Sequence, residues 1–386
     1  MVGVTHKLGI IGFGGMGRSH FDHLTKNYDR LEVKGAFDIS PKAREAAAAR
    51  GTYVYESLDE ILGDPEIDLI LVSTTNDAHK YLSIAAMKAG KNVISEKPVT
   101  MNSGDLEEIM AVAQETGKTF TIDQNRRTNR DFVLMKRNVE SGIIGKPIVI
   151  ESRVEGSRGM PKGWRTLKAL GGGMMLDWGV HLIDQILYMM GDEKVKEIYC
   201  KMLSLQYPEV DDNFHLMMTF ESGLIVIVEV GTNHYIPHPR WYVMGEKGTI
   251  QIDNWNCDGK IIRNITKEDI WDEEIFYTKA GPTKTMAPRS AKSVETITLS
   301  CPEDVTDNLS VVYDQFLDAV EGKAPLTITP EQAMRVMRVM EAAFVSANEK
   351  RSLAVDICFH KRKNPRFFGD FFALDYLLVI VDQFSV

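Results

Sequence analysis

The stretch Gly12-Phe13-Gly14-Gly15-Met16-Gly17 fits the pattern G-x-G-x-x-G and stands between a short apolar run at 8–11 and a helix-like stretch at 16–24. In such a turn the first glycine permits a tight bend, the second lets the backbone approach a pyrophosphate, and the third lets helix and strand pack closely. The N-terminus of the following helix offers unpaired N–H groups to a phosphate. The pattern also occurs in ordinary turns, but its place between strand and helix favours a dinucleotide-binding loop.

Asp38 closes the next strand-like run, at 31–38, and stands 21 residues beyond Gly17. A carboxylate at this position accepts hydrogen bonds from both hydroxyls of the adenosine ribose and repels a 2′-phosphate. No arginine follows Asp38 directly, since the next residues are Ile39-Ser40-Pro41. The sequence therefore predicts NAD as the cofactor, with NADP less favoured. A structural turn with a helix-capping Asp38 is the alternative interpretation.

The first 123 residues alternate between strand-like and helix-like stretches. Apolar runs at 8–11, 31–38, 67–74 and 92–96 are predicted strands, and several of the helical stretches between them end at glycine. The run at 67–74 is apolar almost throughout, as expected of a strand covered on both faces. This alternation implies right-handed βαβ units and a parallel sheet. We therefore predict an α/β chain whose residues 1–123 form a doubly wound Rossmann domain that binds NAD.

Residues 124–355 follow a different pattern, because several predicted strands have no helix between them. Apolar and polar residues alternate over 214–220, and a short turn leads into an apolar run at 224–230. A second hairpin is predicted at 242–252. This pattern predicts an α+β domain with a large open, mostly antiparallel sheet. An exposed face on such a sheet commonly mediates self-association, so we expect a homodimer or homotetramer formed through it.

The end of this second domain carries a clear helix start. Thr329-Pro330-Glu331-Gln332 has a capping threonine, proline at the first helical position and glutamine at the third. The sequence predicts a helix from there to about Glu349.

The composition argues against several classes of protein. Hydrophobic residues make up 44% and charged residues 26% of the 386 residues, close to the globular averages of ~45–50% and ~25%. Lys and Arg number 45 and Asp and Glu 54, and the resulting net charge of −9 argues against nucleic-acid binding, which needs a basic footprint. No stretch approaches the ~18 apolar residues of a membrane span, so no membrane contact is expected.

Cysteine and histidine spacings give no metal signal. Four cysteines stand far apart, with no C-x-x-C pair: Cys200, Cys257, Cys301 and Cys358. Neither a zinc site nor a dithiol redox motif is supported by that spacing. Sparse cysteine and the missing secretory leader predict the reducing cytoplasm. His234, Tyr235 and His238 share a predicted loop without the spacing of metal ligands, so we expect loop packing and no metal.

Residues 356–386 differ from the rest and are assigned to a C-terminal extension. Six of the 16 phenylalanines lie after Asp356, and a basic cluster stands at 360–363. We expect the extension to pack on the body of the protein or on another subunit. Membrane contact is the weaker alternative, because the apolar run at 374–381 is short and interrupted by Asp375.

Two further segments carry chemistry-bearing residues. Glu96-Lys97-Pro98 stands at the carboxyl end of a predicted parallel strand, the edge where ligands bind in open α/β sheets. The X-Pro bond there can be cis. A solvated lysine in a surface turn is the alternative.

The other segment runs over 171–184. On a regular helix Asp177, His181 and Asp184 stand at i, i+4 and i+7, and they form one polar stripe beside an apolar stripe. Such a helix would place a carboxylate and an imidazole in a cleft. Gly179 inside it costs about 1 kcal/mol relative to alanine, which close approach by a ligand or another backbone would explain. A capped amphipathic helix with a satisfied histidine is the alternative.

Together these segments resemble the Gfo/Idh/MocA family of NAD(P)-dependent oxidoreductases. Similar proteins begin with G-x-G-x-x-G, carry E-K-P after the fifth strand and contain G-G…D-x-G-x-H-x-x-D, and all three occur here in that order, within about residues 6–355. The resemblance implies a Rossmann domain, a second domain with a large open sheet, a cis bond before Pro98, substrate at the domain junction, and frequent dimers or tetramers. It also implies that Lys97, Asp177 and His181 are the catalytic residues.

Oxidation of a secondary alcohol removes a hydride from carbon and a proton from oxygen. The cofactor accepts the hydride, and the protein supplies geometry and handles the proton. His181 suits the base, since the ordinary pKa of an imidazole is about 6.5, while Lys97 would hydrogen-bond the reacting oxygen. The proton acceptor is nevertheless left open between these two residues. Asp177 could orient His181 or bind a neighbouring hydroxyl.

Further residues are assigned to the two ligand sites. Besides the glycine loop and Asp38, the expected cofactor contacts are Ser73, Thr74, Asn76, His79, Glu96 and Lys97. Besides Asp177 and His181, the expected substrate contacts are Asn125, Arg126, Trp164 and Arg165. An aromatic face suits the C–H side of a sugar, and arginine suits hydroxyls or a carboxylate. Surface arginines and a core tryptophan are the alternative.

We therefore expect an NAD-dependent dehydrogenase that moves a hydride between nicotinamide and a secondary alcohol of a sugar, inositol or related polyol. One alternative is an NAD-dependent glycosidase or lyase, in which the hydride leaves and returns within one turnover. Another is a non-catalytic dinucleotide-binding sensor, against which the intact Lys97, Asp177 and His181 argue.

Overall fold

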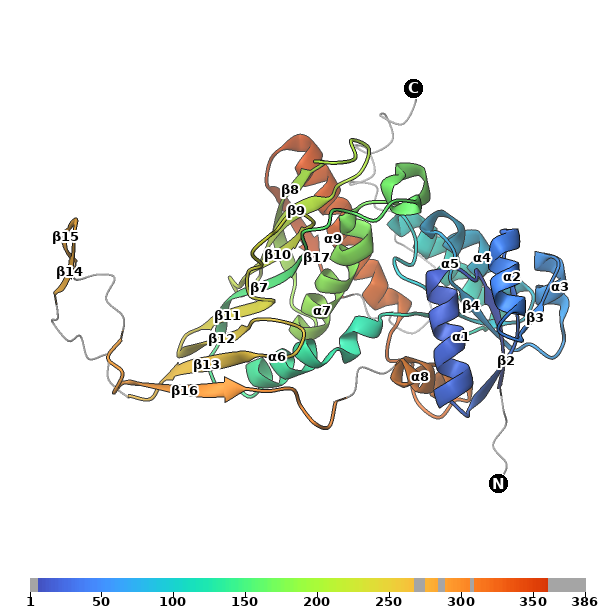
Figure 1. The fold of residues 1–386 in the computed structure, drawn as a ribbon, viewed down its shortest axis with the longest axis horizontal. Coiled ribbons are helices and arrows are strands. Elements are labelled where there is room, and N and C mark those ends of the chain that lie inside the picture. Colours follow the sequence, from blue (N-terminus) through green and yellow to red (C-terminus); the bar gives the residue numbers. More distant parts are fainter. Residues whose placement is uncertain (1–5, 267–274, 284–288, 306–308, 360–386) are drawn as a thin grey trace, which may run out of the picture.

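The computed structural model describes residues 6–266, 275–283, 289–305 and 309–359. Figure 1 shows a parallel sheet wrapped by helices at one end of the molecule and a large second sheet toward the other. The basic cluster at 360–363 and five of the six late phenylalanines lie outside the described residues, so the expected packing of the extension stays a prediction. No helix in the described ranges is both long and apolar enough to cross a membrane.

The first unit is a six-stranded parallel sheet, which confirms the predicted Rossmann fold. The strand order is β3-β2-β1-β4-β5-β6, so the order reverses between β1 and β4. All neighbouring pairs are parallel. The strands are β1 (His6–Ile11), β2 (Leu31–Phe37), β3 (Tyr53–Val54), β4 (Leu69–Val72), β5 (Asn92–Ser95) and β6 (Phe120–Ile122). The helices around them are α1 (Gly15–Asn27), α2 (Pro41–Ala48), α3 (Leu58–Gly63), α4 (His79–Lys88) and α5 (Ser103–Thr116).

The second unit is a nine-stranded sheet in the order β16-β13-β12-β11-β7-β10-β9-β8-β17. Only β7 and β10 pair in parallel, so the prediction of a mostly antiparallel sheet is confirmed. The two predicted hairpins are present as β9–β10 and β11–β12. The strands are β7 (Pro147–Glu155), β8 (Val195–Leu203), β9 (Asn213–Phe220), β10 (Ile225–Gly231), β11 (Trp241–Gly245), β12 (Gly248–Ile252), β13 (Gly259–Asn264), β16 (Val294–Leu299) and β17 (Leu353–Ile357). A separate small hairpin consists of β14 (Phe276–Thr278) and β15 (Gly281–Thr283).

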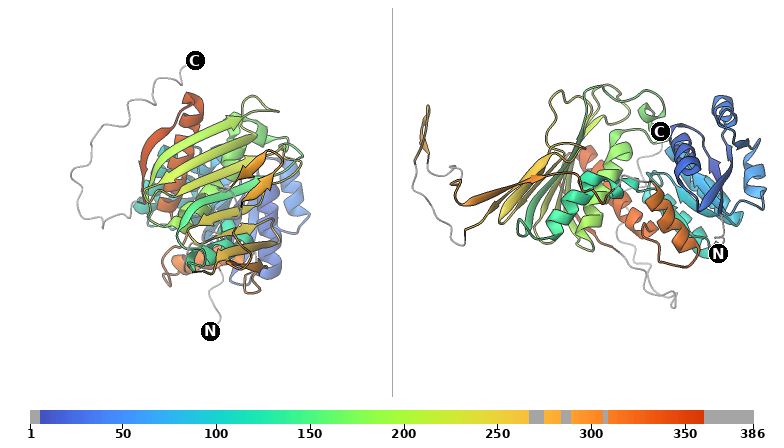
Figure 2. Two further views of the ribbon diagram at one scale, coloured as in Figure 1. Left: turned by 90° about the vertical axis from the view of Figure 1, so that its left-hand side faces the viewer. Right: turned by 60° about the horizontal axis from the view of Figure 1, so that its bottom comes forward.

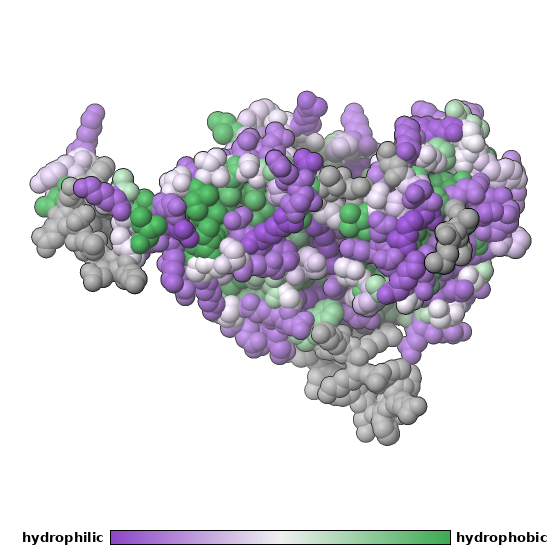
Figure 3. Space-filling model, turned by 90° about the horizontal axis from the view of Figure 1, so that it is seen from below, coloured by the Kyte–Doolittle hydropathy of each residue, from purple (hydrophilic) through white to green (hydrophobic). Residues whose placement is uncertain are grey.

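Helices cover one face of this sheet and leave the other open (Figure 2). The covering helices are α6 (Arg130–Glu140), α7 (Val180–Met190) and α9 (Pro330–Glu349). Along the strands buried and exposed apolar side chains alternate, as with the buried Met218 beside the exposed Met217. Exposed apolar residues of the strands are Ile148, Tyr199, Leu203, Met217 and Ile262. Figure 3 shows hydrophobic side chains gathered at the end of the molecule that the nine-stranded sheet forms.

The last two helices connect the units. The capping box predicted at Thr329 is present: its hydroxyl accepts from the Gln332 amide at 3.3 Å and its amide donates to the Gln332 side chain at 3.3 Å. From there α9 packs against β8, α7, α5 and β6, which belong to both units. The preceding helix, α8 (Ser310–Val320), returns to the Rossmann unit, where Asp314 and Asp318 bind the guanidinium of Arg30. Helices α8 and α9 therefore hold the two units together.

The edge strand β17 pairs with β8 and continues to Ile357. The sheet therefore includes Asp356 and Ile357, the first two residues that we assigned to the extension.

Candidate functional site

The glycine loop between β1 and α1 has open space over its middle. A Cβ on Gly14 or Gly15 would meet no described atom within 4 Å, whereas one on Gly17 would lie 2.0 Å from the Gly12 carbonyl oxygen. Gly12 itself has a φ of +94° and the oxygen of Ser73 2.6 Å from its would-be Cβ. The N-cap residue, Gly14, offers no side chain to the first N–H groups of α1. Free amides beside open space fit the pyrophosphate of NAD.

Asp38 follows β2 and is tied to the same loop. One carboxylate oxygen accepts from the Phe13 amide and the other from the Ser40 amide, both at 2.7 Å. These bonds fix the carboxylate next to the glycine loop and leave lone pairs for ribose hydroxyls. Arg44 donates to the backbone oxygen of Asp38 at 2.8 Å. The position of Asp38 therefore fits the predicted contact with the adenosine ribose.

Four other residues assigned to the cofactor bind the backbone of nearby loops. Ser73 donates to the Gly12 oxygen at 2.7 Å, and Thr74 donates to the Thr75 oxygen at 3.3 Å. The side-chain amide of Asn76 donates to the Gly171 oxygen in the second unit at 2.7 Å. The buried His79 contacts the Pro98 oxygen at 2.9 Å, and burial lowers its pKa. Ser73, Asn76 and His79 thus hold the glycine loop, the 171–173 segment and the turn at Pro98 in place.

Lys97 crosses from the Rossmann unit to the second unit. It follows β5, and the bond to Pro98 is cis, as the resemblance implied. Its Nζ donates to the backbone oxygen of Asp177 at 2.8 Å and to the carboxylate Oδ1 at 3.1 Å. Arg165 donates to the other carboxylate oxygen at 2.8 Å. Burial alone would raise the pKa of Asp177, but Lys97 and Arg165 lower it below its ordinary value.

The turn that carries Asp177 is π-helical rather than regular. Residues Met175–Gly179 form this π-turn, and α7 begins at Val180, so the predicted regular helix is wrong for its first turn. A Cβ on Gly179 would lie 2.8 Å from Met175 Sδ and 3.0 Å from the Phe214 ring. Close packing on β9 therefore explains this glycine. Asp177 in this turn binds Lys97. Asp184 instead accepts from two guanidinium nitrogens of Arg127, at 2.6 and 2.7 Å.

His181 lies in the first turn of α7 and is 4% exposed. Its Nδ1 is buried and has no hydrogen-bond partner among the described residues, so Asp177 pairs with Lys97 and Arg165 rather than with His181. Burial lowers the pKa of His181 well below 6.5, and the charges of Lys97, Arg126 and Arg240 lower it further. The imidazole is therefore neutral at pH 7, and the same shift makes it a weaker base than a solvent-exposed histidine.

Trp178 lies beside His181, and Trp255 and Arg126 lie beside Trp178. The ring of Trp178 is 5.8 Å from that of His181 and 6.0 Å from that of Trp255, which comes from the loop between β12 and β13. The guanidinium carbon of Arg126 lies 4.9 Å from the Trp178 ring centre and 5.7 Å from that of Trp255. Sequence analysis assigned Arg126 but neither Trp178 nor Trp255. No local pattern connects residue 255 to the site, because only the folded sheet brings its loop there.

The other residues assigned to substrate binding are Trp164, Arg165 and Asn125. Arg165 stacks on Trp164, with 4.5 Å from the guanidinium carbon to the ring centre, inside a short helical turn at Trp164–Thr166. Asn125 donates to the Asp123 carboxylate at 2.9 Å, while its own side-chain oxygen is buried without a partner among the described residues. Arg165 thus binds the carboxylate that Lys97 also binds, whereas Asn125 stands beside Asp123, which follows β6.

A cavity of about 660 Å³ opens beside these residues. It lies between the carboxyl ends of β7 and β10 and the π-turn. Its polar lining includes Glu155, Arg158, Arg165 and Asp177, and Trp178 contributes an aromatic wall. A small polar molecule with several hydroxyls fits a cavity of this size and chemistry.

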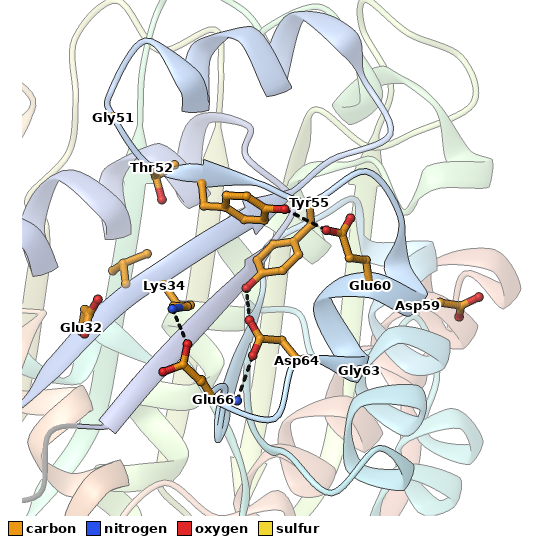
Figure 4. A pocket seen from close by; sticks show the side chains of 12 residues that line it. Glu32, Lys34, Gly51, Thr52, Tyr55, Asp59, Glu60, Gly63, Asp64 and Glu66 are labelled. Atoms are coloured by element: carbon orange, nitrogen blue, oxygen red, sulfur yellow. Dashed lines mark hydrogen bonds and ion pairs between the residues drawn. The ribbon is translucent and has the colours of Figure 1, made fainter.

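A larger cavity of about 840 Å³ lies elsewhere, at the β3 edge of the Rossmann sheet (Figure 4). Acidic residues dominate its lining, and several are already paired: Tyr55 donates to Asp64 at 2.6 Å and Lys34 to Glu66 at 2.5 Å. Lys97 follows β5, near the opposite edge of that sheet. Asp177 and Arg165 line the smaller cavity, whereas Lys97 and His181 are not among its lining residues.

A buried polar cluster that sequence analysis missed lies behind Lys97. His20, on α1, is 2.9 Å from a Glu96 oxygen, 3.4 Å from an Asp123 oxygen and 2.8 Å from the hydroxyl of Tyr313. Burial alone would lower the pKa of His20, but hydrogen bonds and charges of the two carboxylates raise it to about 9. His20 is therefore an imidazolium at pH 7. It binds Glu96, the residue before Lys97, and Asp123, which stands two residues before Asn125.

His234 and His238 bind carboxylates of two strands rather than packing within their loop, and Tyr235 is exposed. His238 is 2.9 Å and His234 is 3.4 Å from Glu155, and His234 is 3.9 Å from Glu229. Sequence spacing gave no sign of these partners, since Glu155 at the end of β7 lies far away in the chain and Glu229 lies inside β10.

Comparison with known proteins places this geometry in a family. Residues 6–124 match the model of the oxidoreductase family with an NAD-binding Rossmann fold, and residues 132–251 match the GFO/IDH/MocA C-terminal domain. The chain belongs to the Gfo/Idh/MocA family. The resemblance found in the sequence is thus confirmed, and the protein is an oxidoreductase with an NAD-binding domain.

Several relatives of this Gfo/Idh/MocA protein match over most of their length. The scyllo-inositol 2-dehydrogenase (NADP(+)) of Bacillus subtilis is 27% identical over 361 residues, 91% of this chain and 96% of the relative. The myo-inositol 2-dehydrogenase of Thermotoga maritima is 30% identical over 256 residues, 64% of this chain and 75% of the relative. A crystal structure of an NAD-binding protein from Listeria innocua is 41% identical, with a TM-score of 0.86 over 91% of this chain and 99% of that chain.

Proposed function

We propose that this protein oxidises a secondary alcohol of a sugar, inositol or related polyol with NAD, and reduces the matching ketone in reverse. The observation that carries the proposal is the contact of Lys97 with Asp177 across the two units, with a neutral His181 four residues further on. The names of the inositol dehydrogenase relatives support a polyol as substrate. NAD, when bound, supplies the acceptor for the hydride.

The residues of this chain handle the proton and the oxygen. Lys97 uses two of the three donors of an ammonium group on Asp177 and keeps one for the reacting hydroxyl. That hydrogen bond favours the alkoxide character that develops as the hydride leaves. We propose that the neutral His181 accepts the hydroxyl proton, although its lowered pKa makes it a weaker base than a free imidazole. Asp177, held by Arg165, positions Lys97.

The test is an NADH absorbance assay with purified protein, NAD and a panel of inositols, hexoses and sugar acids. We expect net NADH with at least one polyol, and loss of that signal in Lys97→Met and His181→Asn while NAD still binds. Arg137→Gln is a matched control, because this arginine pairs with the exposed Asp304. Normal turnover in both site variants would refute the site assignment. Glycoside cleavage without net NADH would select the transient-oxidation alternative.

We also propose that the open face of the nine-stranded sheet joins copies of this chain into a homodimer or homotetramer. The exposed apolar residues of that face support this, since monomers rarely expose large apolar patches. Light scattering on the wild type should give a multiple of the 43.4 kDa chain mass. Met217→Glu should lower the measured mass, whereas a monomeric wild type would refute the proposal.

The free thiols of all four cysteines support the cytoplasm as the location of the protein.

A further inference from the structure

Cys257 and Cys301 lie far apart in the sequence and touch in the structure. The antiparallel pair β13–β16 ends with Gly259 opposite Leu299, and each cysteine stands two residues beyond that pair. Their sulfur atoms are 3.1 Å apart. The absence of a C-x-x-C pair gave no support for a dithiol, but strand pairing builds one from distant residues. A disulfide bond, at about 2.0 Å, needs a shift of only about 1 Å.

The two thiols differ in access. Cys257 is fully buried and has a left-handed backbone with a φ of +67°. Cys301 is partly exposed, and Arg130 donates to its sulfur at 3.9 Å. An external reagent therefore reaches Cys301 first, and Cys257 is placed to react only with Cys301.

The pair is connected to the substrate side of the site through a short loop. Cys257 stands two residues after Trp255, whose ring lies 6.0 Å from that of Trp178. The side-chain oxygen of Asn254 accepts from the amides of Asn256 and Asp258 at 3.0 and 3.3 Å, so the loop is closed on itself. We expect a shift of Cys257 toward Cys301 to move Trp255 as well.

We propose that Cys257 and Cys301 form a reversible disulfide that tethers the Trp255 loop and thereby changes substrate binding. The oxidant is a low-molecular-weight disulfide such as oxidised glutathione. The Cys301 thiolate attacks one of its sulfurs and releases one glutathione thiol, and the Cys257 thiolate then displaces the second. Two protein thiols become one S–S bond, and one glutathione disulfide becomes two thiols. In a reducing compartment such a bond is transient and suits redox sensing.

The chemical test uses the full-length protein, reduced, desalted and then treated with oxidised glutathione. We expect a mass loss equal to two hydrogen atoms, two fewer alkylatable thiols and a peptide that links Cys257 to Cys301. Dithiothreitol should reverse all three. Cys257→Ser should instead leave a stable glutathione adduct on Cys301, because the resolving thiol is missing. Cys200→Ser and Cys358→Ser are controls that should keep the cross-link. An unlinked pair, or a link through Cys358, would overturn the proposal.

The functional test rests on the proposed dehydrogenase activity. We expect oxidation to change the KM for the polyol by about threefold or more while the Kd for NAD stays the same, since the glycine loop lies in the other unit. Cys301→Ser should remove this response to oxidant. A cross-link that leaves the polyol KM unchanged would overturn the coupling through Trp255. Absence of turnover in the reduced wild type would count against the dehydrogenase proposal, whereas the mass measurement still decides the disulfide.

Discussion

The cofactor half and the substrate half of this site are held in different ways. Around the glycine loop the contacts come from backbone groups: the amides of α1, the close approach of Gly17 to the Gly12 oxygen, and the amides that fix Asp38. On the substrate side they come from charged side chains, with Lys97 and Arg165 on Asp177. Backbone dipoles do not titrate and are changed little by substitution. The substrate half should therefore respond more strongly to pH and to single mutations than the cofactor half.

His20 gives the largest expected effect on stability, because it is a buried cation that contacts two buried carboxylates. In His20→Asn the carboxylates of Glu96 and Asp123 lose their charged partner, and removing one member of a buried ion pair costs about 3–5 kcal/mol. Urea unfolding should show this loss. Tyr313→Phe, which removes only a hydrogen bond to His20, should cost about 1 kcal/mol. Equal, small losses in both variants would argue against a buried imidazolium.

The same histidine predicts how stability depends on pH. The pKa of His20 is raised to about 9 in the folded protein, against about 6.5 in the unfolded chain. Its contribution to the free energy of unfolding is therefore complete below about pH 6.5, falls as the pH rises toward 9, and is absent above that. The difference in unfolding free energy between wild type and His20→Asn, measured in this window, should shrink with rising pH. A constant difference would show that His20 is neutral.

Asp177→Asn tests the charged substrate half. The substitution keeps one acceptor for Lys97 but removes the negative charge that Lys97 and Arg165 share. We expect kcat/KM to fall by about 10–100-fold with an unchanged Kd for NAD. Asp304→Asn, which changes the same charge at an exposed pair with Arg137, is the control. If the Kd for NAD rose as much as kcat/KM fell, the separation of the two halves would be wrong.

Asp38→Ser gives the smallest expected effect, confined to the cofactor half. Removing this carboxylate takes away the repulsion of a 2′-phosphate, and Arg44 already binds the backbone of the same residue. We expect the ratio of kcat/KM with NAD to kcat/KM with NADP to fall by about tenfold. The polyol KM with either cofactor should stay the same. A preference for NADP in the wild type would contradict the role given to Asp38.

Local signals made much of this structure predictable. The glycine loop, the strand before Glu96 and the capping box at Thr329 each depend on neighbouring residues, so their positions could be derived from the sequence. The family resemblance added the expected roles of Lys97 and His181, which stay predictions.

Contacts that depend on long-range pairing were not predictable. Trp255 reaches the site through a hairpin loop, Cys257 meets Cys301 through the register of β13 and β16, and His20 meets Asp123 across the Rossmann sheet. The π-turn was missed for a similar reason. Gly179 in this turn packs on Phe214, and no spacing within 171–184 reports a ring from β9.

The most direct test of the account is a crystal structure of the protein with NAD and a polyol that it oxidises. We predict that the reacting hydroxyl lies within hydrogen-bond distance of both Lys97 Nζ and a ring nitrogen of His181, with the nicotinamide on the other side of the same carbon. A polyol bound away from either residue, or a nicotinamide that does not reach Lys97, would contradict the claim that the two units share one reaction centre.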